Sequence, residues 1–263
     1  MACQMKKKLL LLLLVLLVSN LQHCVNGTQQ VPCFFISGDS WSDNGNNNNL
    51  VTKAKANYQP YGIDFPGGPT GRFTNGRNLV DIIAEHLGFN NSIPPFATAS
   101  GQEILKGVNY ASGAAGIREE TGQLLGDRIS LDRQLLNLQV TVSNIKNLLG
   151  NNESLATAYL NNYIYSVAIG NNDYLNNYFM PQFYPTSRIY NQLGLLGYTP
   201  VELTMCGTNS SCVNNIFNAV TLFNDRVVTL VNDFNNNLTN ARFIYINTTE
   251  ITLSSSTSQG KIS

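Results

Sequence analysis

A serine that could act as a nucleophile follows an apolar run near the start of the chain, in the stretch Phe34-Phe35-Ile36-Ser37-Gly38-Asp39-Ser40. Hydrolytic α/β enzymes expose a nucleophile in this way, at the carboxyl end of a buried strand and beside glycine. The spacing is not Gly-x-Ser-x-Gly, so the usual nucleophile elbow is not matched. We interpret Ser40 as a candidate nucleophile for acyl transfer. A plain polar turn is the alternative, because the same residue types are common in turns.

Two further loops place small or amide residues directly after apolar segments. The sequence predicts that Gly107–Gly116 is a short strand that runs into a loop containing Gly113. It also predicts that Tyr163–Ile169 is a strand, with Asn172 in the loop that follows. Because the carboxyl ends of parallel strands meet at one edge of a sheet, we expect Ser40, Gly113 and Asn172 to lie close together. The structural alternatives are a turn glycine and a strand-end cap.

The elements that would position these loops alternate between strands and helices. Apolar periodicity predicts a helix at 78–87, with Leu79, Ile82, Ile83 and Leu87 on one face, and further helices at 129–149 and 213–238. On the second helix the stripe is Leu131, Leu135, Leu138, Val142, Ile145 and Leu149. A last strand is predicted at 242–246, and Tyr58–Asn75 reads as a long ordered loop. The alternation predicts a parallel sheet covered by helices on both faces.

Composition narrows the function classes. The chain has 263 residues, zero net charge and 12% charged residues. This length suffices for one large domain or two small ones. Zero charge, without a basic cluster past the first ten residues, argues against nucleic acid as a partner. The sequence shows no metal-ligand cluster, phosphate loop or dinucleotide fingerprint, so we expect neither a metal nor a cofactor.

The first residues have the pattern of a secretion signal. Lys6–Lys8 form a basic region, and Leu9–Val18 form an apolar run too short to span a bilayer of about 30 Å. With cleavage after Gly27, we expect residues 1–27 to be a signal peptide and residues 28–263 to form a secreted, extracellular domain without a stable membrane span. An uncleaved membrane anchor is the alternative.

Secretion allows glycosylation and disulfide formation, and the sequence carries signals for both. Asn-x-Ser/Thr sequons, candidates for glycosylation, occur at Asn26, Asn90, Asn152, Asn209, Asn237 and Asn247. Of the five cysteines, Cys3 and Cys24 belong to the predicted signal. Cys206 and Cys212 are close enough to close a small disulfide loop. Cys33 is then a buried thiol or a cysteine without its partner.

In combination, four motifs resemble the plant GDSL esterase/lipases of the SGNH hydrolase superfamily, from Val31 to about Thr249. These motifs lie at 38–47, 69–77, 109–113 and 170–173. The resemblance implies an α/β, flavodoxin-like three-layer SGNH hydrolase fold with a parallel sheet. It also implies a secreted serine hydrolase that acts on the carboxylic ester bonds of small acyl-ester or lipid substrates through a Ser40 acyl-enzyme. The Ser40 N–H, the Gly113 N–H and the Asn172 side-chain amide would form the oxyanion hole.

Two departures from the family pattern affect this expectation. Trp41 stands where the family name specifies leucine, and the family's late Asp-x-x-His-Pro motif, which supplies the catalytic Asp and His, is not found. His23 lies in the predicted signal, and we interpret His86 as a core or interface histidine on the apolar face of its helix. Asp43 and Asp173 are near the loops, but neither matches the family's base.

We therefore expect a partial hydrolase domain in which the last strand and the final catalytic block are missing. A serine is a poor nucleophile without an adjacent base. The alternatives to an active esterase are a catalytically impaired fragment and an extracellular binding pseudoenzyme. The unpaired segment 242–246 would form an apolar sheet edge prone to aggregation. The oligomeric state is left open.

Overall fold

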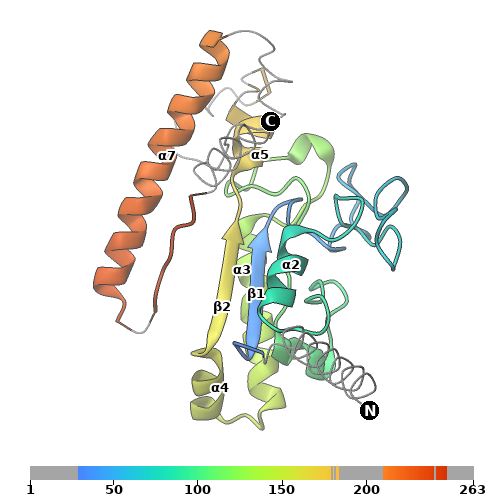
Figure 1. Cartoon of the computed structure of the whole chain (residues 1–263), viewed down its shortest axis with the longest axis vertical. Helices are drawn as coiled ribbons and strands as arrows, with labels where there is room; N and C mark the ends of the chain where they lie inside the picture. Colours follow the sequence, from blue (N-terminus) through green and yellow to red (C-terminus); the bar gives the residue numbers. More distant parts are fainter. Residues whose placement is uncertain (1–28, 179, 181, 184–209, 240, 248–263) are drawn as a thin grey trace, which may run out of the picture.

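The computed structural model describes residues 29–178, 180, 182–183, 210–239 and 241–247. The predicted signal peptide, the sequons Asn26 and Asn209, and Cys206 lie outside these residues. Two parallel strands, β1 (Cys33–Gly38) and β2 (Tyr163–Ala168), run side by side in Figure 1. Their register pairs Cys33 with Tyr163 at one end and Gly38 with Ala168 at the other. Both strands agree with the apolar runs in the sequence.

The segment predicted as a strand at 107–116 lies along the other edge of β1, but it pairs less regularly than expected. The Ile36 N–H donates to the Val108 carbonyl at 3.1 Å, and the Tyr110 N–H donates to the Ile36 carbonyl at 2.7 Å. The result is an isolated parallel bridge between Ile36 and Asn109 rather than a full strand. This segment leads into the Gly113 loop, which therefore begins beside the carboxyl end of β1.

Alternate residues of β1 face two different helices, which makes the described fold a layered α/β arrangement. Phe34 and Ile36 pack with Val80 and Ala84 of α2 (Leu79–His86). On the opposite face, Phe35 shares a core with Ile145 of α3 (Leu131–Leu148). β1 is fully buried and apolar from Cys33 to Ile36, which is typical of a strand covered on both sides. The predicted α/β class with parallel strands and helices is confirmed.

Helix α2 begins where the sequence predicts, at the capping box formed by Asn78 and Asp81, but its buried face differs. Leu79 and Ile82 are 54% and 38% exposed, whereas Asp81 is buried. The physical reason is an ion pair between Asp81 and Arg72, which draws this side of the helix inward. His86, expected in the core or an interface, is exposed, so the core alternative is wrong and the interface alternative stays a prediction.

Helix α3 also matches its predicted position, with Ser130 as its N-cap. Ile145 is buried as expected, but Leu135 is 46% exposed and Gln134 is fully buried in its place. The Gln134 amide is tolerated inside because all of its bonded partners are backbone groups. The remaining elements before residue 180 are η1 (Gly101–Lys106), η2 (Gln123–Leu125), α4 (Glu153–Leu160), α5 (Asn171–Asp173) and the short π-helix η3 (Tyr174–Tyr178).

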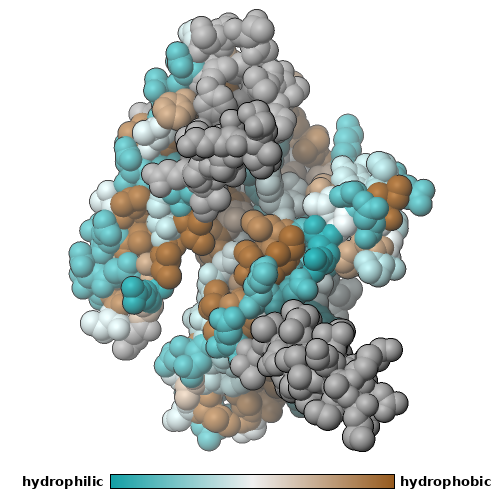
Figure 2. Space-filling model, viewed as in Figure 1, coloured by the Kyte–Doolittle hydropathy of each residue, from teal (hydrophilic) through white to brown (hydrophobic). Residues whose placement is uncertain are grey.

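The long helix α7 (Ser210–Asn237) packs Ile216 and Val220 against Tyr174. Figure 2 shows hydrophobic side chains along its visible face. Among the hydrophobic residues of α7, Phe217 and Leu230 are exposed. None of the described helices combines the length and the hydropathy needed to cross a membrane.

The strand predicted at 242–246 is wrong, because this segment has irregular backbone and runs back beside α7 (Figure 1). Both backbone groups of Phe243 are bonded to the Asn235 side chain, which accepts from the Phe243 N–H at 2.7 Å and donates to its carbonyl at 2.9 Å. The Phe234 and Phe243 rings lie 5.0 Å apart. The outer edge of the described sheet is therefore β2, whose Val167 is 59% exposed.

Candidate active site

Ser40 lies in the turn directly after β1, at the carboxyl end of the strand. The Asp39 carbonyl accepts from the Ser42 N–H at 3.1 Å and from the Asp43 N–H at 3.0 Å, which closes this turn. Ser40 is half-buried, and within the described residues neither its hydroxyl nor its N–H forms a hydrogen bond. The hydroxyl is therefore not held by any side chain in the part of the chain that the structure describes.

Asp39, next to the candidate nucleophile, is a buried carboxyl. Its Oδ1 accepts from the Trp41 N–H at 3.0 Å, while its Oδ2 is buried without a partner among the described residues. Burial raises the pKa of Asp39 to about 7, and the nearby charges of Asp173 and Asp43 add to the effect. A carboxyl with such a pKa binds its proton near neutral pH.

Asp43 is a second buried carboxyl, and it organises the backbone around the turn. Its Oδ1 accepts from the N–H groups of Gly45 and Asn46 at 2.8 and 2.9 Å. Its Oδ2 accepts from the Gly113 N–H at 2.9 Å. Burial nevertheless raises the pKa of Asp43 to about 6, because it outweighs these bonds and the charge of Arg72.

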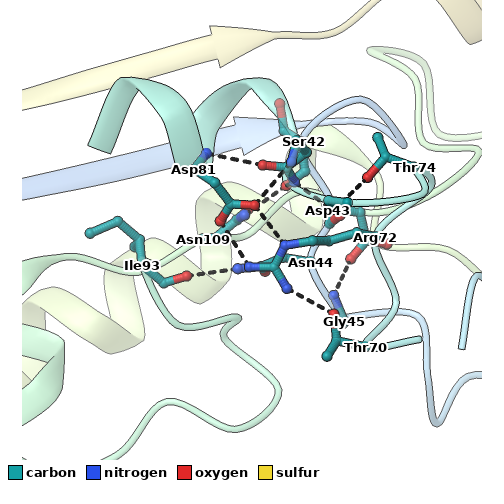
Figure 3. A network of polar contacts seen from close by, with 12 residues as sticks. Ser42, Asp43, Asn44, Gly45, Thr70, Arg72, Thr74, Asp81, Ile93 and Asn109 are labelled. Carbon is teal, nitrogen blue, oxygen red and sulfur yellow. Dashed lines mark hydrogen bonds and ion pairs between the residues drawn. The ribbon is translucent and has the colours of Figure 1, made fainter. Parts of the chain in front are cut away.

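Figure 3 shows the polar network that supports this turn. The Arg72 guanidinium makes a two-pronged contact with Asp81, at 2.6 Å from Nε and 2.8 Å from Nη2. The guanidinium carbon also lies 4.2 Å from the centre of the Phe65 ring. The charge of Arg72 and its hydrogen bonds keep the pKa of Asp81 low, although burial acts in the opposite direction. This buried ion pair joins the loop before α2 to the helix itself.

Asparagine side chains bond the backbone of the same turn from several directions. Asn109 Nδ2 donates to the Ser42 carbonyl at 2.7 Å, and Asn78 Nδ2 donates to the same carbonyl at 3.2 Å. Asn46 Nδ2 donates to the carbonyls of Asn109 and Ala111. The asparagines of this region are therefore part of the interior scaffold rather than a solvated loop surface.

Gly113 is brought to the same edge of the sheet as Ser40, because the Ser112 N–H donates to the Gly38 carbonyl at 3.1 Å. A Cβ at Gly113 would lie 2.5 Å from Phe73 Cζ, so a larger residue here would displace the Phe73 ring. The N–H that was predicted to line an oxyanion hole points at Asp43.

Asn172 also lies at this edge, in the short helix α5 that follows β2. Its Nδ2 donates to the Ala115 carbonyl at 2.9 Å, and its Oδ1 accepts from Asn176 at 2.6 Å. The adjacent Asp173 accepts from the N–H groups of Ile117 and Arg118 at 2.8 and 3.0 Å. The structure thus gathers the Ser40, Gly113 and Asn172 loops together, with the amides of the last two engaged by protein acceptors.

The exposed His86 lies far from Ser40. Gln30, just before β1, bonds the His86 carbonyl at 2.9 Å, which places the end of α2 beside the amino end of the strand. Ser40 follows the carboxyl end, about 20 Å away for a six-residue strand. Among the described residues, no cluster of three or more His, Cys, Asp and Glu side chains could hold a metal ion.

The described sequons and cysteines lie in different surroundings. Asn90, Asn152 and Asn237 are exposed, and Asn247 is half-buried. The Asn152 Oδ1 caps α4.

Cys212 is disulfide-bonded, while its predicted partner Cys206 lies outside the described residues. Cys33 is a buried free thiol, as one of the two sequence alternatives stated.

Comparisons of the sequence with known proteins identify the family of this chain. The profile of the family described as GDSL-like Lipase/Acylhydrolase matches residues 34–263. GDSL esterase/lipase At1g29670 of Arabidopsis thaliana is 50% identical over 248 residues, which covers 83% of this chain and 68% of the relative. The chain belongs to the GDSL esterase/lipase family. A second Arabidopsis thaliana relative, GDSL esterase/lipase At1g29660, is 48% identical over 263 residues, covering 88% of this chain and 72% of its own length. No solved structure gave a significant match.

In this GDSL family member, sequence reasoning missed several residues that hold the site. Gln134, Asn78 and Asn109 are 0–2% exposed and bond backbone groups around Ser40. A polar residue within an otherwise apolar helical stripe was the available signal for Gln134. Trp41, the departure from the family name, is 58% exposed.

Proposed function

We propose that Ser40 is the nucleophile of a secreted esterase that acts on small acyl-ester or lipid substrates. Membership of the GDSL-like lipase/acylhydrolase family makes the chain a carboxylic ester hydrolase by family. The observation that supports the proposal is the position of Ser40, in the turn directly after β1 and at the same edge as the Gly113 and Asn172 loops. Its hydroxyl forms no hydrogen bond with the described residues.

The proposed reaction has two steps. Ser40 Oγ attacks the ester carbonyl carbon and loses its proton to a base, and the alcohol leaves with a proton as the acyl-enzyme forms. Water then attacks the acyl-enzyme, which releases the acid and restores the hydroxyl. The Ser40 N–H donates to no acceptor among the described residues, so it is available as one oxyanion donor. For Gly113 and Asn172 to contribute, the oxyanion must replace Asp43 and the Ala115 carbonyl as their acceptors.

One observation favours a second candidate function. The only imidazole among the described residues, His86, is at the other end of β1 from Ser40. A serine without a positioned base retains only the acceleration of the oxyanion hole, roughly 10³–10⁴-fold over water. The second candidate is therefore an extracellular protein that binds acyl ligands with little turnover.

Secretion is part of the proposal and has its own support. The basic and apolar stretches before Gly27 have the pattern of a cleaved signal. Asn90, Asn152 and Asn237 are exposed and accessible to glycosylation. Sequencing the N-terminus of protein collected from the medium of expressing cells should begin at Thr28, and retention of the full chain in the cells would contradict secretion.

Hydrolysis of p-nitrophenyl acetate and butyrate by the purified chain tests the reaction. Ser40→Ala should abolish activity, whereas Ser143→Ala, an exposed serine on α3, should leave it unchanged. Equal activity in the Ser40→Ala variant would show that another group acts as the nucleophile. Binding of an acyl ligand without hydrolysis would favour the second candidate.

A further inference from the structure

The side chain of Gln134 clamps the residue that ends β1. Gln134 Oε1 accepts from the Gly38 N–H at 2.9 Å, and Gln134 Nε2 donates to the Gly38 carbonyl at 2.8 Å. Gln134 is fully buried and comes from α3, 96 residues further along the chain. One planar amide therefore holds both backbone groups of Gly38, two residues before Ser40.

The same clamp reaches the Gly113 loop. The Gly38 carbonyl also accepts from the Ser112 N–H at 3.1 Å, so Gln134 and Ser112 share this acceptor. Gln134 Nε2 donates in addition to the Ile129 carbonyl at 2.9 Å, and the Ile129 N–H donates to Ser112 Oγ at 2.9 Å. The nucleophile turn, the Gly113 loop and the start of α3 thus meet around one amide.

The structure offers few other ways to fix the backbone of Gly38. A Cβ at Gly38 would lie 2.8 Å from the Ala168 carbonyl oxygen, so Gly38 has no room for a side chain that could anchor it. A buried amide is unfavourable unless it is hydrogen-bonded, and here it makes three bonds. A methionine of similar size would fill the space but leave the Gly38 N–H without its acceptor.

We propose that Gln134 is a positioning residue for ester hydrolysis, which acts through Gly38 to set Ser40 relative to the Gly113 loop. This inference rests on the proposed function of Ser40. Its physical basis is that reacting groups must be held within a fraction of an ångström, since a displacement of about 1 Å can cost 10²-fold in rate. Loss of the clamp lowers kcat, while KM changes little because Gln134 is buried behind the turn.

The first test compares kcat and KM of variants at three α3 positions on p-nitrophenyl acetate, well below their melting temperatures. Gln134→Met should lower kcat by about 10²-fold with KM within about twofold. Gln139→Met, at an exposed glutamine of the same helix, should retain wild-type kcat. Ile145→Val and Ile145→Ala lower Tm through the core without contact to Gly38, and they should also retain kcat.

A rescue experiment separates positioning from general stability. Gln134→Glu restores one donor and one acceptor when the introduced carboxyl is protonated, but it faces the Gly38 carbonyl with a negative charge when ionised. Its kcat, relative to wild type at each pH, should therefore rise as the pH falls, whereas the deficit of Gln134→Met should not depend on pH. A kcat for Gln134→Met equal to that of an Ile145 variant of matched Tm, or a pH-independent deficit for Gln134→Glu, overturns the proposal.

Amide hydrogen exchange tests the contact between Gln134 and Gly38 without relying on esterase activity. If the wild-type chain hydrolyses no ester, the proposed function fails on its own account. The clamp is then judged by exchange at Gly38 and Ser112, which should be faster in Gln134→Met and unchanged in Gln139→Met. Unchanged exchange at both amides in Gln134→Met overturns the clamp.

Discussion

The Gly113 N–H donates to Asp43 Oδ2 across 2.9 Å, which joins two loops that are 70 residues apart in the sequence. The other oxygen of Asp43 accepts from two backbone N–H groups of its own loop. One fully buried carboxyl thus fixes the loop after Ser40 and the loop predicted to supply an oxyanion donor.

Replacing Asp43 should destabilise the protein. In Asp43→Asn an amide NH₂ replaces one acceptor, so at least one of the three N–H groups loses its partner. We expect the free energy of unfolding to fall by about 1.5–3 kcal/mol, the range for hydrogen bonds to charged groups. Urea denaturation measures this. Asp233→Asn, at an exposed position on α7, should change it by less than about 0.5 kcal/mol. Equal stability of the two variants would contradict the role of Asp43.

Stability should fall as the pH rises from about 5 to 8. Burial raises the pKa of Asp39 to about 7 and that of Asp43 to about 6, so in this range the folded state binds protons that the unfolded state has released. Asp81, whose pKa is lowered, acts in the opposite direction only below about pH 4. Urea unfolding at several pH values should show a smaller slope for Asp39→Asn. An unchanged slope would mean that Asp39 is not the group that titrates.

The buried pair of Arg72 and Asp81 should be sensitive to the loss of either partner. Asp81→Asn leaves the guanidinium uncompensated, and we expect it to cost about 3–5 kcal/mol of unfolding free energy. Arg72→Lys keeps the charge but loses the two-pronged geometry.

A solvent-exposed ion pair supplies the control for Arg72 and Asp81. Arg77 and Glu85 are 52% and 61% exposed in their side chains, so Glu85→Gln should cost less than about 1 kcal/mol. A cost for Asp81→Asn as small as this would indicate that the buried pair is hydrated in solution.

The cysteines should react differently in the native protein. Burial raises the pKa of the Cys33 thiol to about 12, so iodoacetamide at pH 8 should label it only after unfolding. Cys212 is disulfide-bonded, and we predict Cys206 as its partner. Mass spectrometry of a non-reducing digest should find these two cysteines in one linked species. Rapid labelling of native Cys33, or free thiols at 206 and 212, would contradict these expectations.

Local patterns in the sequence were sufficient to predict the strands and helices that carry the site. The apolar run before Gly38 predicted β1, the run at Tyr163 predicted β2, and capping and periodicity located α2, α3 and α7 within a few residues. The same reasoning placed the Ser40, Gly113 and Asn172 loops at one edge, because successive parallel strands end there. These features are determined by residues that are close together in the sequence, so they can be predicted from the sequence alone.

Tertiary structure decided which polar groups are buried and what they bond. The burial of Gln134 contradicts a simple apolar stripe, since it depends on Gly38, a partner 96 residues away in the chain. Segment 242–246 has the composition of a strand, yet Asn235 takes both backbone groups of Phe243. The bond between Gly113 and Asp43 likewise has no sequence signature. Hydrogen bonds between distant segments depend on the folded positions of both partners, so only the three-dimensional arrangement determined them.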